Sequence, residues 1–273
     1  MKRILLIFAA LCLILAGCGG KQPEPTAPTV TEPTEPQMKT VWVRTSQTSE
    51  TRGRTSRTEL IYGENDRVTE AAVWVNDTET LRYAVECDEN GNFIRWTSHE
   101  EVQEYTYDDQ GRLLTYNCYT GETLTTGYEF TYDASGNRTR VRLHMDRLDV
   151  VQQTDYIYDE KGQNVRQEVY LGDELSRYSD CVCDEEGRLL ALITYTADGK
   201  PDLITDYTYE GTVETQVSRN ANGELIQTIV ITRDTWGNIV RTESYSAAGV
   251  LLVTETTAWK AIAVPIDCPR ASV

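Results

Sequence analysis

A short motif repeats along the chain and constrains its fold more than any other feature. The motif is Tyr-x-Tyr-Asp-x-x-Gly followed by Arg, Asn or Gln. Four good copies lie at 105–112 (YTYDDQGR), 130–137 (FTYDASGN), 156–163 (YIYDEKGQ) and 181–188 (CVCDEEGR), and weaker ones at 85–92, 207–211 and 231–238. The glycines of this series are 20 to 26 residues apart, and a second series of turns lies between them. Each period therefore holds two strands and two turns.

Each period is typical of a β-hairpin. The stretches between turns are rich in Tyr, Val, Ile, Leu and Thr, which suit a pleated surface. Asp-x-x-Gly fits a type I turn in which the carboxylate accepts local backbone N–H groups and the glycine takes the left-handed conformation. Pro201 is the only proline between residues 38 and 264, as a ladder paired on both sides requires. No 3.6-residue periodicity is sustained, which argues against helices.

The repeats predict an all-β domain over residues 38–260. We expect about 14 strands between Val41 and Trp259, connected as an antiparallel meander. Because strand twist accumulates across a sheet of this size, the sheet should curl into an open or spiral, barrel-like shell. Tyrosine, with 16 copies against three of phenylalanine, should supply much of the core. Residues 261–273 are predicted to form a C-terminal tail.

The repeated units resemble the YD repeats of the RHS family over most of residues 85–245. The resemblance implies a long β-sheet that spirals into a shell, which in large members encloses a toxin or takes part in cell-surface contact and carbohydrate binding. This chain departs from the large members in two ways. It has no toxin-sized segment after the repeats, and it has no match to their Asp-Pro-containing core motif.

The N-terminus has the pattern of an export signal. Lys2 and Arg3 precede an apolar run, Ile4 to Ala16, which is shorter than the about 20 residues that a membrane-spanning helix needs. The run ends in Leu-Ala-Gly-Cys at 15–18, which resembles the lipobox of bacterial lipoproteins. The resemblance implies removal of a signal peptide, residues 1–17, and attachment of lipid to Cys18. The alternative is an ordinary secretory signal in which Cys18 is incidental.

Residues 18–37 are predicted to form a Pro/Thr/Glu-rich tether after the lipidated cysteine. They hold five of the eight prolines, so they should behave as a semi-rigid polyproline II spacer with a reach of up to roughly 60 Å. The net charge of −17 becomes −19 without Lys2 and Arg3. This acidity argues against nucleic acid as a partner and against adhesion to anionic headgroups. The lipid anchor is then the predicted membrane contact.

Catalytic and metal-binding motifs are absent from the sequence. The two histidines, His99 and His144, fall on different predicted segments, and His99 lies beside Glu100 and Glu101 in a predicted solvated turn. Beyond Cys18, an odd number of cysteines follows, which does not suit a disulfide framework: Cys87, Cys118, Cys181, Cys183 and Cys268. Cys181 and Cys183 share a face, but a zinc site would need two more ligands. We predict no catalytic, cofactor or metal site.

Three classes of function fit these features. The first is a non-catalytic binding module for a carbohydrate or protein ligand, lipid-anchored to the cell membrane and exposed in the envelope outside the cytoplasm. The second is a structural scaffold of the envelope. The third, for which no residues stand out, is a hydrolase of cell-wall polymers.

Overall fold

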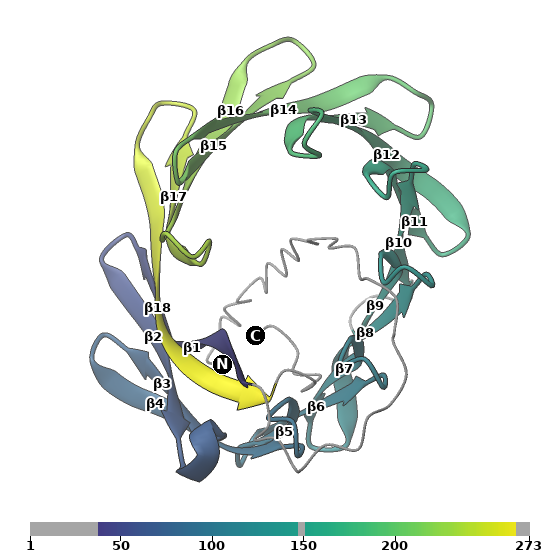
Figure 1. The fold of residues 1–273 in the computed structure, drawn as a ribbon. Coiled ribbons are helices and arrows are strands. Elements are labelled where there is room, and N and C mark those ends of the chain that lie inside the picture. The colour runs from purple at the N-terminus through teal and green to yellow at the C-terminus, as the bar shows by residue number, and fades with distance from the viewer. Residues whose placement is uncertain (1–37, 147–150, 266–273) are drawn as a thin grey trace, which may run out of the picture. The chain divides into compact units, whose positions relative to one another are not determined.

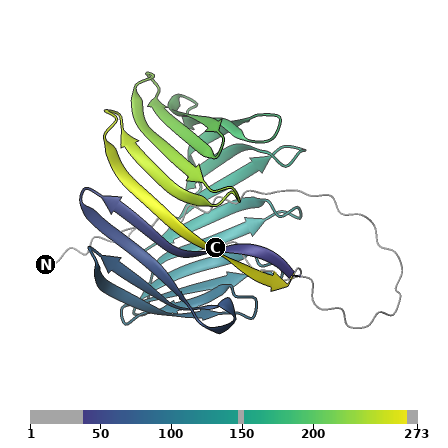
Figure 2. The ribbon, with the colours of Figure 1, turned by 60° about the vertical axis from the view of Figure 1, so that its left-hand side comes forward.

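The domain is an all-β antiparallel meander of 18 strands that closes into a barrel. The computed structural model describes residues 38–146 and 151–265, which belong to one compact unit. Figure 1 views the barrel along its axis, and Figure 2 shows turns at both ends of the wall. The strands are β1 Met38–Thr51, β2 Arg54–Tyr62, β3 Val68–Val75, β4 Thr78–Cys87, β5 Phe93–Thr97, β6 Glu101–Tyr107, β7 Leu113–Thr120, β8 Thr123–Tyr132, β9 Arg138–Met145, β10 Gln152–Tyr158, β11 Asn164–Leu171, β12 Glu174–Cys183, β13 Leu189–Thr196, β14 Pro201–Glu210, β15 Val213–Asn220, β16 Leu225–Arg233, β17 Ile239–Ser246 and β18 Leu251–Pro265.

The prediction of a curled antiparallel meander is confirmed, while the expected number of about 14 strands and the open or spiral shape are only approximately right. Residues 38–146 and 151–265 form 18 strands, in which every strand pairs with its neighbours in sequence and β1 also pairs with β18, so the sheet closes on itself. The first third of the domain holds β1 to β6, and among its turns only the one at Asp88–Gly91 carries the repeated motif. Closure itself depends on pairing between the two ends of the domain, which the spacing of repeats does not encode. It removes the unpaired N–H and C=O groups that an open edge would expose.

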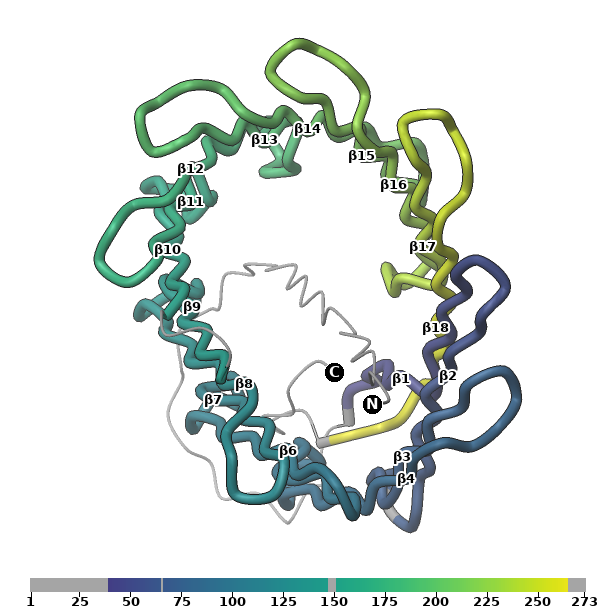
Figure 3. Tube along the Cα trace, turned by 180° about the vertical axis from the view of Figure 1, so that it is seen from behind, coloured from purple at the N-terminus to yellow at the C-terminus, as the bar shows by residue number. Residues whose placement is uncertain are grey.

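The first and last strands form the longest ladder in the barrel. It runs from Met38 opposite Pro265 to Thr51 opposite Val253, with a β-bulge between Arg44 and Ser46. On the Met38 side of the bulge, β1 separates from β2 and β18 separates from β17. The two strands continue together as a ribbon, Met38–Arg44 with Trp259–Pro265, that lies inside the ring of other strands (Figures 1 and 3). β18 thus continues past residue 260, and the first five residues of the predicted tail belong to the strand.

Contacts across the barrel identify the inner face of the wall. The Tyr62 hydroxyl on β2 donates to the Arg44 carbonyl on the ribbon at 2.6 Å, and the Arg44 guanidinium acts electrostatically on Tyr105 of β6. Because β6 is not a hydrogen-bonded neighbour of β1, the interaction between Arg44 and Tyr105 crosses the interior. Residues that lie two positions apart from Tyr105 along β6 therefore also point inward. The strand register then identifies the inward-facing residues of the neighbouring strands.

The hydrophobic core fills one sector of the interior. One cluster lies on β2 to β5 and a second on the ribbon, and Tyr62 contacts both. The fully buried members are Val43, Leu60, Val68, Ala71, Tyr83, Val85, Phe93, Trp96, Ile262 and Val264. From β7 to β17, the inner side chains are mostly half-buried tyrosine, threonine, glutamine and serine. Tyrosine, which composition predicted to supply much of the core, contributes only Tyr83 to the buried residues of the described chain, and its other described copies are half-buried.

We predict that the ribbon is a main source of stability. Ile262 is 5% exposed and Ile157 on the outer wall is 41% exposed. The Ile262→Ala substitution should lower the free energy of unfolding by about 2–5 kcal/mol, because it opens a cavity between the ribbon and Tyr62. Ile157→Ala, the matched control, should cost less than about 1 kcal/mol. Urea unfolding followed by circular dichroism measures both, and equal losses would show that the ribbon does not pack as described.

Candidate functional site

The repeated motif builds the turns at one end of the barrel, which we call the motif end. It holds the turns that leave even-numbered strands, and the turns that leave odd-numbered strands form the opposite end. In the β6–β7 turn, Asp108 Oδ1 accepts the backbone N–H groups of Gln110 and Arg112, each at 2.9 Å, and Gly111 has φ +76°. The sequence prediction for this turn is confirmed, and the other Asp-x-x-Gly turns repeat its backbone hydrogen bonds.

The residue after the glycine links one repeat to the next. The Arg112 side chain donates from Nε to Asp108 Oδ2 at 2.6 Å, and its guanidinium lies 4.8 Å from the centre of the Tyr132 ring in the following motif. The Tyr132 hydroxyl donates back to the Leu113 carbonyl at 2.9 Å. Arg188 and Tyr209 repeat this arrangement. The second tyrosine and the arginine of the motif are therefore engaged in structure.

The aromatic rings on the inner face mainly contact one another. A chain of ring contacts crosses β4 to β8, with centroid separations from 5.1 to 6.4 Å. Its members are Tyr83, Trp96, Phe93, Tyr105, Tyr116, Tyr128 and Phe130. Tyr83 donates to Glu101 at 3.0 Å and Tyr105 to Gln103 at 2.9 Å. These rings pack as a core, and their contacts leave little free surface for a ligand.

The predicted histidine and cysteine positions do not converge. His99 lies in the β5–β6 turn, as expected, while His144 lies on β9 within 3.8 Å of Glu129. Cys181 donates to Asn164 Oδ1 at 3.0 Å, and burial raises the pKa of its thiol to about 11, which opposes the thiolate needed for nucleophilic attack or metal binding. Among residues 38–146 and 151–265, no group of three His, Cys, Asp or Glu side chains is placed to hold a metal. Cys18 and Cys268 lie outside the described residues, as do the predicted signal peptide and tether.

The outer wall carries arginine–carboxylate pairs between neighbouring strands. They occur around the circumference: Arg82–Glu70, Arg95–Glu104, Arg140–Asp155, Arg142–Glu129, Arg166–Asp180 and Arg219–Asp206. Arg140 Nε and Asp155 Oδ1, for example, are 2.6 Å apart, and both side chains are partly exposed. Such exposed pairs add little stability. Their significance is that they place charge on the face that a membrane-spanning barrel covers with an apolar band.

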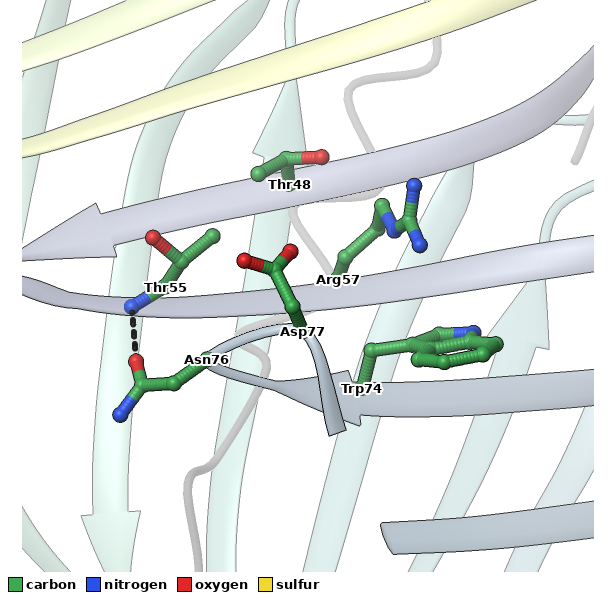
Figure 4. Close-up of a pocket in the computed structure, with 6 residues that line it drawn as sticks. All are labelled: Thr48, Thr55, Arg57, Trp74, Asn76 and Asp77. Carbon is green, nitrogen blue, oxygen red and sulfur yellow. Dashed lines mark hydrogen bonds between the residues drawn. The ribbon is translucent and has the colours of Figure 1, made fainter. Parts of the chain in front are cut away.

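One pocket on the outer wall combines an aromatic ring with unused polar groups. It has a volume of about 230 Å³ and lies where β1, β2 and β3 approach the opposite end (Figure 4). The lining residues are Thr48, Thr55, Arg57, Trp74, Asn76 and Asp77. Sequence reasoning did not single out this site, because it lies before the first recognisable repeat.

The pocket is shaped by the tight turn between β3 and β4. Asn76 and Asp77 both have left-handed φ angles, 48° and 63°, which asparagine and aspartate tolerate better than most residues. Asn76 Oδ1 accepts the Thr55 N–H at 2.9 Å, and the Asn76 N–H donates to the Thr55 carbonyl at 2.9 Å (Figure 4). These bonds attach the turn to β2 and hold the Asp77 side chain beside Arg57.

The polar groups of the pocket are only partly engaged. Arg57 pairs with Glu59 at 3.0 Å, and its guanidinium lies 5.3 Å from the centre of the Trp74 ring. The Trp74 indole N–H is buried without an acceptor in the described part of the chain. Within the same residues, the Asp77 carboxylate has neither a hydrogen bond nor an ion pair. The site therefore offers the Asp77 carboxylate, which has no partner among the described residues, and an aromatic ring.

Comparisons with known proteins identify no family for the chain. No protein-family model and no curated protein sequence matches it. A porin-like protein from Bacteroides uniformis ATCC 8492 is similar over 80% of this chain and 98% of its own, at 12% identity and a TM-score of 0.43. A porin-like protein from Bacteroides vulgatus ATCC 8482 matches the same shares at 11% identity and a TM-score of 0.34.

A toxin shell is a third structural neighbour. The Photorhabdus luminescens Tc holotoxin pore matches 70% of this chain at 10% identity, with a TM-score of 0.31. This chain covers only 14% of that toxin chain. At these identities and TM-scores the neighbours support no conclusion about this chain, and the resemblance to YD repeats rests on the sequence motif. No helix in the described residues is long and apolar enough to cross a bilayer.

The turns at the motif end predict a loss of stability in acid. The Asn137 side-chain amide, which donates to Asp133, lowers the pKa of that carboxyl, and at Asp108 the bonds from Arg112 and Gln110 outweigh an opposing effect of burial to lower its pKa as well. These folded-state pKa values lie below the unfolded value of about 3.9. The stabilisation from the ionised carboxylates is therefore complete above the unfolded pKa and is lost as the pH falls through the folded-state pKa values. The urea midpoint should fall between pH 5 and pH 2, and Asp133→Asn should reduce that fall. A pH-independent midpoint would contradict the prediction.

The inner tyrosines predict a second transition in alkali. Burial raises the pKa of Tyr207 to about 12, and it also raises the pKa of Tyr105 and Tyr116. Unfolded tyrosines ionise near pH 10, so the stability from these neutral phenols is complete below that pH and declines above it. The phenolate absorbance at 295 nm should therefore rise together with loss of the β-sheet circular dichroism signal. Complete ionisation near pH 10 with the fold intact would show that the rings are not shielded.

Proposed function

We propose that the protein is a lipid-tethered, extracytoplasmic and non-catalytic binding module in the cell envelope, with a carbohydrate or protein ligand. The charged outer wall is the observation that carries this proposal. A lysine or arginine on the lipid face of a membrane barrel costs about 2–4 kcal/mol at the bilayer midplane, and this wall carries arginines around its circumference. The barrel is suited to water, so its attachment to a membrane needs a separate anchor.

The N-terminal sequence supplies that anchor and a spacer. Lipid on Cys18 would hold the chain at the membrane, and the proline-rich residues 18–37 would keep the barrel away from the surface. The acidic composition would add repulsion from anionic headgroups, which also favours a position away from the bilayer. A module held at this distance is placed to meet ligands in the envelope.

The distribution of reactive groups favours binding over catalysis. The motif carboxylates are occupied by turn N–H groups and arginines, and the described histidines lie apart on β9 and the β5–β6 turn. The pocket at Trp74 has one carboxylate, whereas glycoside hydrolysis generally uses a facing pair. A scaffold role remains the second candidate, because the linked repeats form a continuous wall that would serve it equally well.

Detergent phase partition separates the tethered barrel from a membrane-spanning one. The full chain, expressed in a bacterium, should enter the detergent phase of Triton X-114, because two acyl chains give stable anchoring. A chain that begins at residue 19, and so lacks Cys18, should enter the aqueous phase. Retention of this shorter chain in the detergent phase would show that the barrel itself contacts lipid and would overturn the proposal.

A further inference from the structure

We infer that the pocket at Trp74 is a binding site for a single neutral sugar unit, either a free saccharide or one residue of a longer glycan. This inference rests on the proposed binding function and assigns it a site and a ligand class. Trp74 would contact the carbon-bound hydrogens of a pyranose ring, and Asp77 and Arg57 would hydrogen-bond its hydroxyls. All three side chains line the same pocket on the outer wall (Figure 4).

The chemistry of the pocket matches the two kinds of surface on a sugar. A pyranose presents a patch of C–H groups that packs on an aromatic face and a rim of hydroxyls that both donate and accept. Trp74 supplies a large apolar ring, while the Asp77 carboxylate accepts and the Arg57 guanidinium donates. Thr48 and Thr55 add hydroxyls that do either. Charge-assisted bonds from Asp77 and Arg57 would be the stronger polar contacts.

An unused carboxylate explains why a ligand would stabilise this site. The Trp74 N–H has no acceptor among the described residues, but it is enclosed, so the indole ring is the contact that this residue offers to a ligand. The Asp77 carboxylate has no partner in the same part of the chain, although Arg57 lines the pocket with it. Arg57 is instead held by Glu59 at 3.0 Å. A hydroxylated ligand in the pocket would satisfy the Asp77 carboxylate without breaking the Arg57–Glu59 pair.

The site is formed in advance by backbone geometry. The two hydrogen bonds between Asn76 and Thr55 fix the β3–β4 turn against β2, so Asp77 needs no rearrangement of the turn to contact a ligand. Such preorganisation lowers the entropic cost of binding.

Size and charge narrow the ligand class. The volume of about 230 Å³ is below the roughly 300–1,000 Å³ of sites for drug-sized ligands, which fits one sugar ring and not an oligomer enclosed on all sides. Glu59 beside Arg57 and the net charge of −17 disfavour an anionic ligand. Trp236, which is 66% exposed, lies outside this pocket and is stacked on Trp42 at 4.6 Å.

The test uses residues 19–273, a chain that keeps all 18 strands and the closing β1–β18 ladder. Methyl glycosides of glucose, mannose, galactose and N-acetylglucosamine are titrated while tryptophan fluorescence is followed, and isothermal titration calorimetry confirms the binding constants. At least one glycoside should bind saturably. Trp74→Ala and Asp77→Asn should each weaken that binding by about tenfold or more, since each removes a central contact. Trp236→Ala is the matched control and should leave the affinity unchanged.

Pull-down with insoluble cell-wall polysaccharide then distinguishes the two sources of the sugar. Retention on the polymer that is competed by the free glycoside indicates a residue within a glycan, and its absence indicates a free saccharide. The Asp77→Asn variant keeps the side-chain size at an exposed turn, so its thermal unfolding should match the parent chain and separate loss of binding from loss of fold.

Two results would overturn the inference, and they differ in what they say of the proposed function. Saccharide binding that is unaffected by Trp74→Ala and Asp77→Asn would show that the barrel is a glycan-binding module with its site elsewhere. No saturable binding of any glycoside or polymer by the parent chain would exclude a sugar site at Trp74. The binding function would then depend on a protein partner, recovered by crosslinking the full chain on intact cells.

Discussion

The structure depends on the need to pair every backbone N–H and C=O group of a very long meander. A single hairpin is marginal in water, and a sheet of many hairpins leaves two edges unless its ends meet. Here the ends meet through the β1–β18 ladder, the longest pairing in the barrel. Once this ladder forms, the sheet is closed, and the tyrosine and arginine links between neighbouring motifs act on a continuous ring.

Much of the fold was predictable from local sequence because its turns are formed by residues that are close together in the chain. Asp108 and Gly111 specify their turn through contacts within five residues, so the motif alone predicted its geometry and the antiparallel meander. The number of strands was not predictable in the same way. Turns such as Arg52-Gly53 and Asn76-Asp77 are formed by residues that no longer resemble the motif, and closure depends on contacts between strands more than 200 residues apart.

The pocket at Trp74 was beyond prediction for a related reason. Its six lining residues come from three strands and a turn, and none has a distinctive spacing in the sequence. The one sequence feature that marks these residues is the absence of the motif, because Trp74 and Asp77 belong to the part of the domain that departs from the repeat. In a repeat protein, positions outside the motif can acquire residues that contact a ligand. Motif residues such as Arg112 and Tyr132 already make the hydrogen bonds that hold the repeats together.

Antiparallel closure also restricts how a barrel of this kind can change in size. In a meander, each strand runs opposite to the one before it, so the last strand can pair antiparallel with the first only when their number is even. Gain or loss of one strand would force a parallel pairing at the seam. Gain or loss of a complete hairpin preserves parity and alters mainly the circumference, since barrel diameter grows with strand number. The two-strand period of the motif is therefore the smallest unit by which this barrel can be duplicated or shortened and still close.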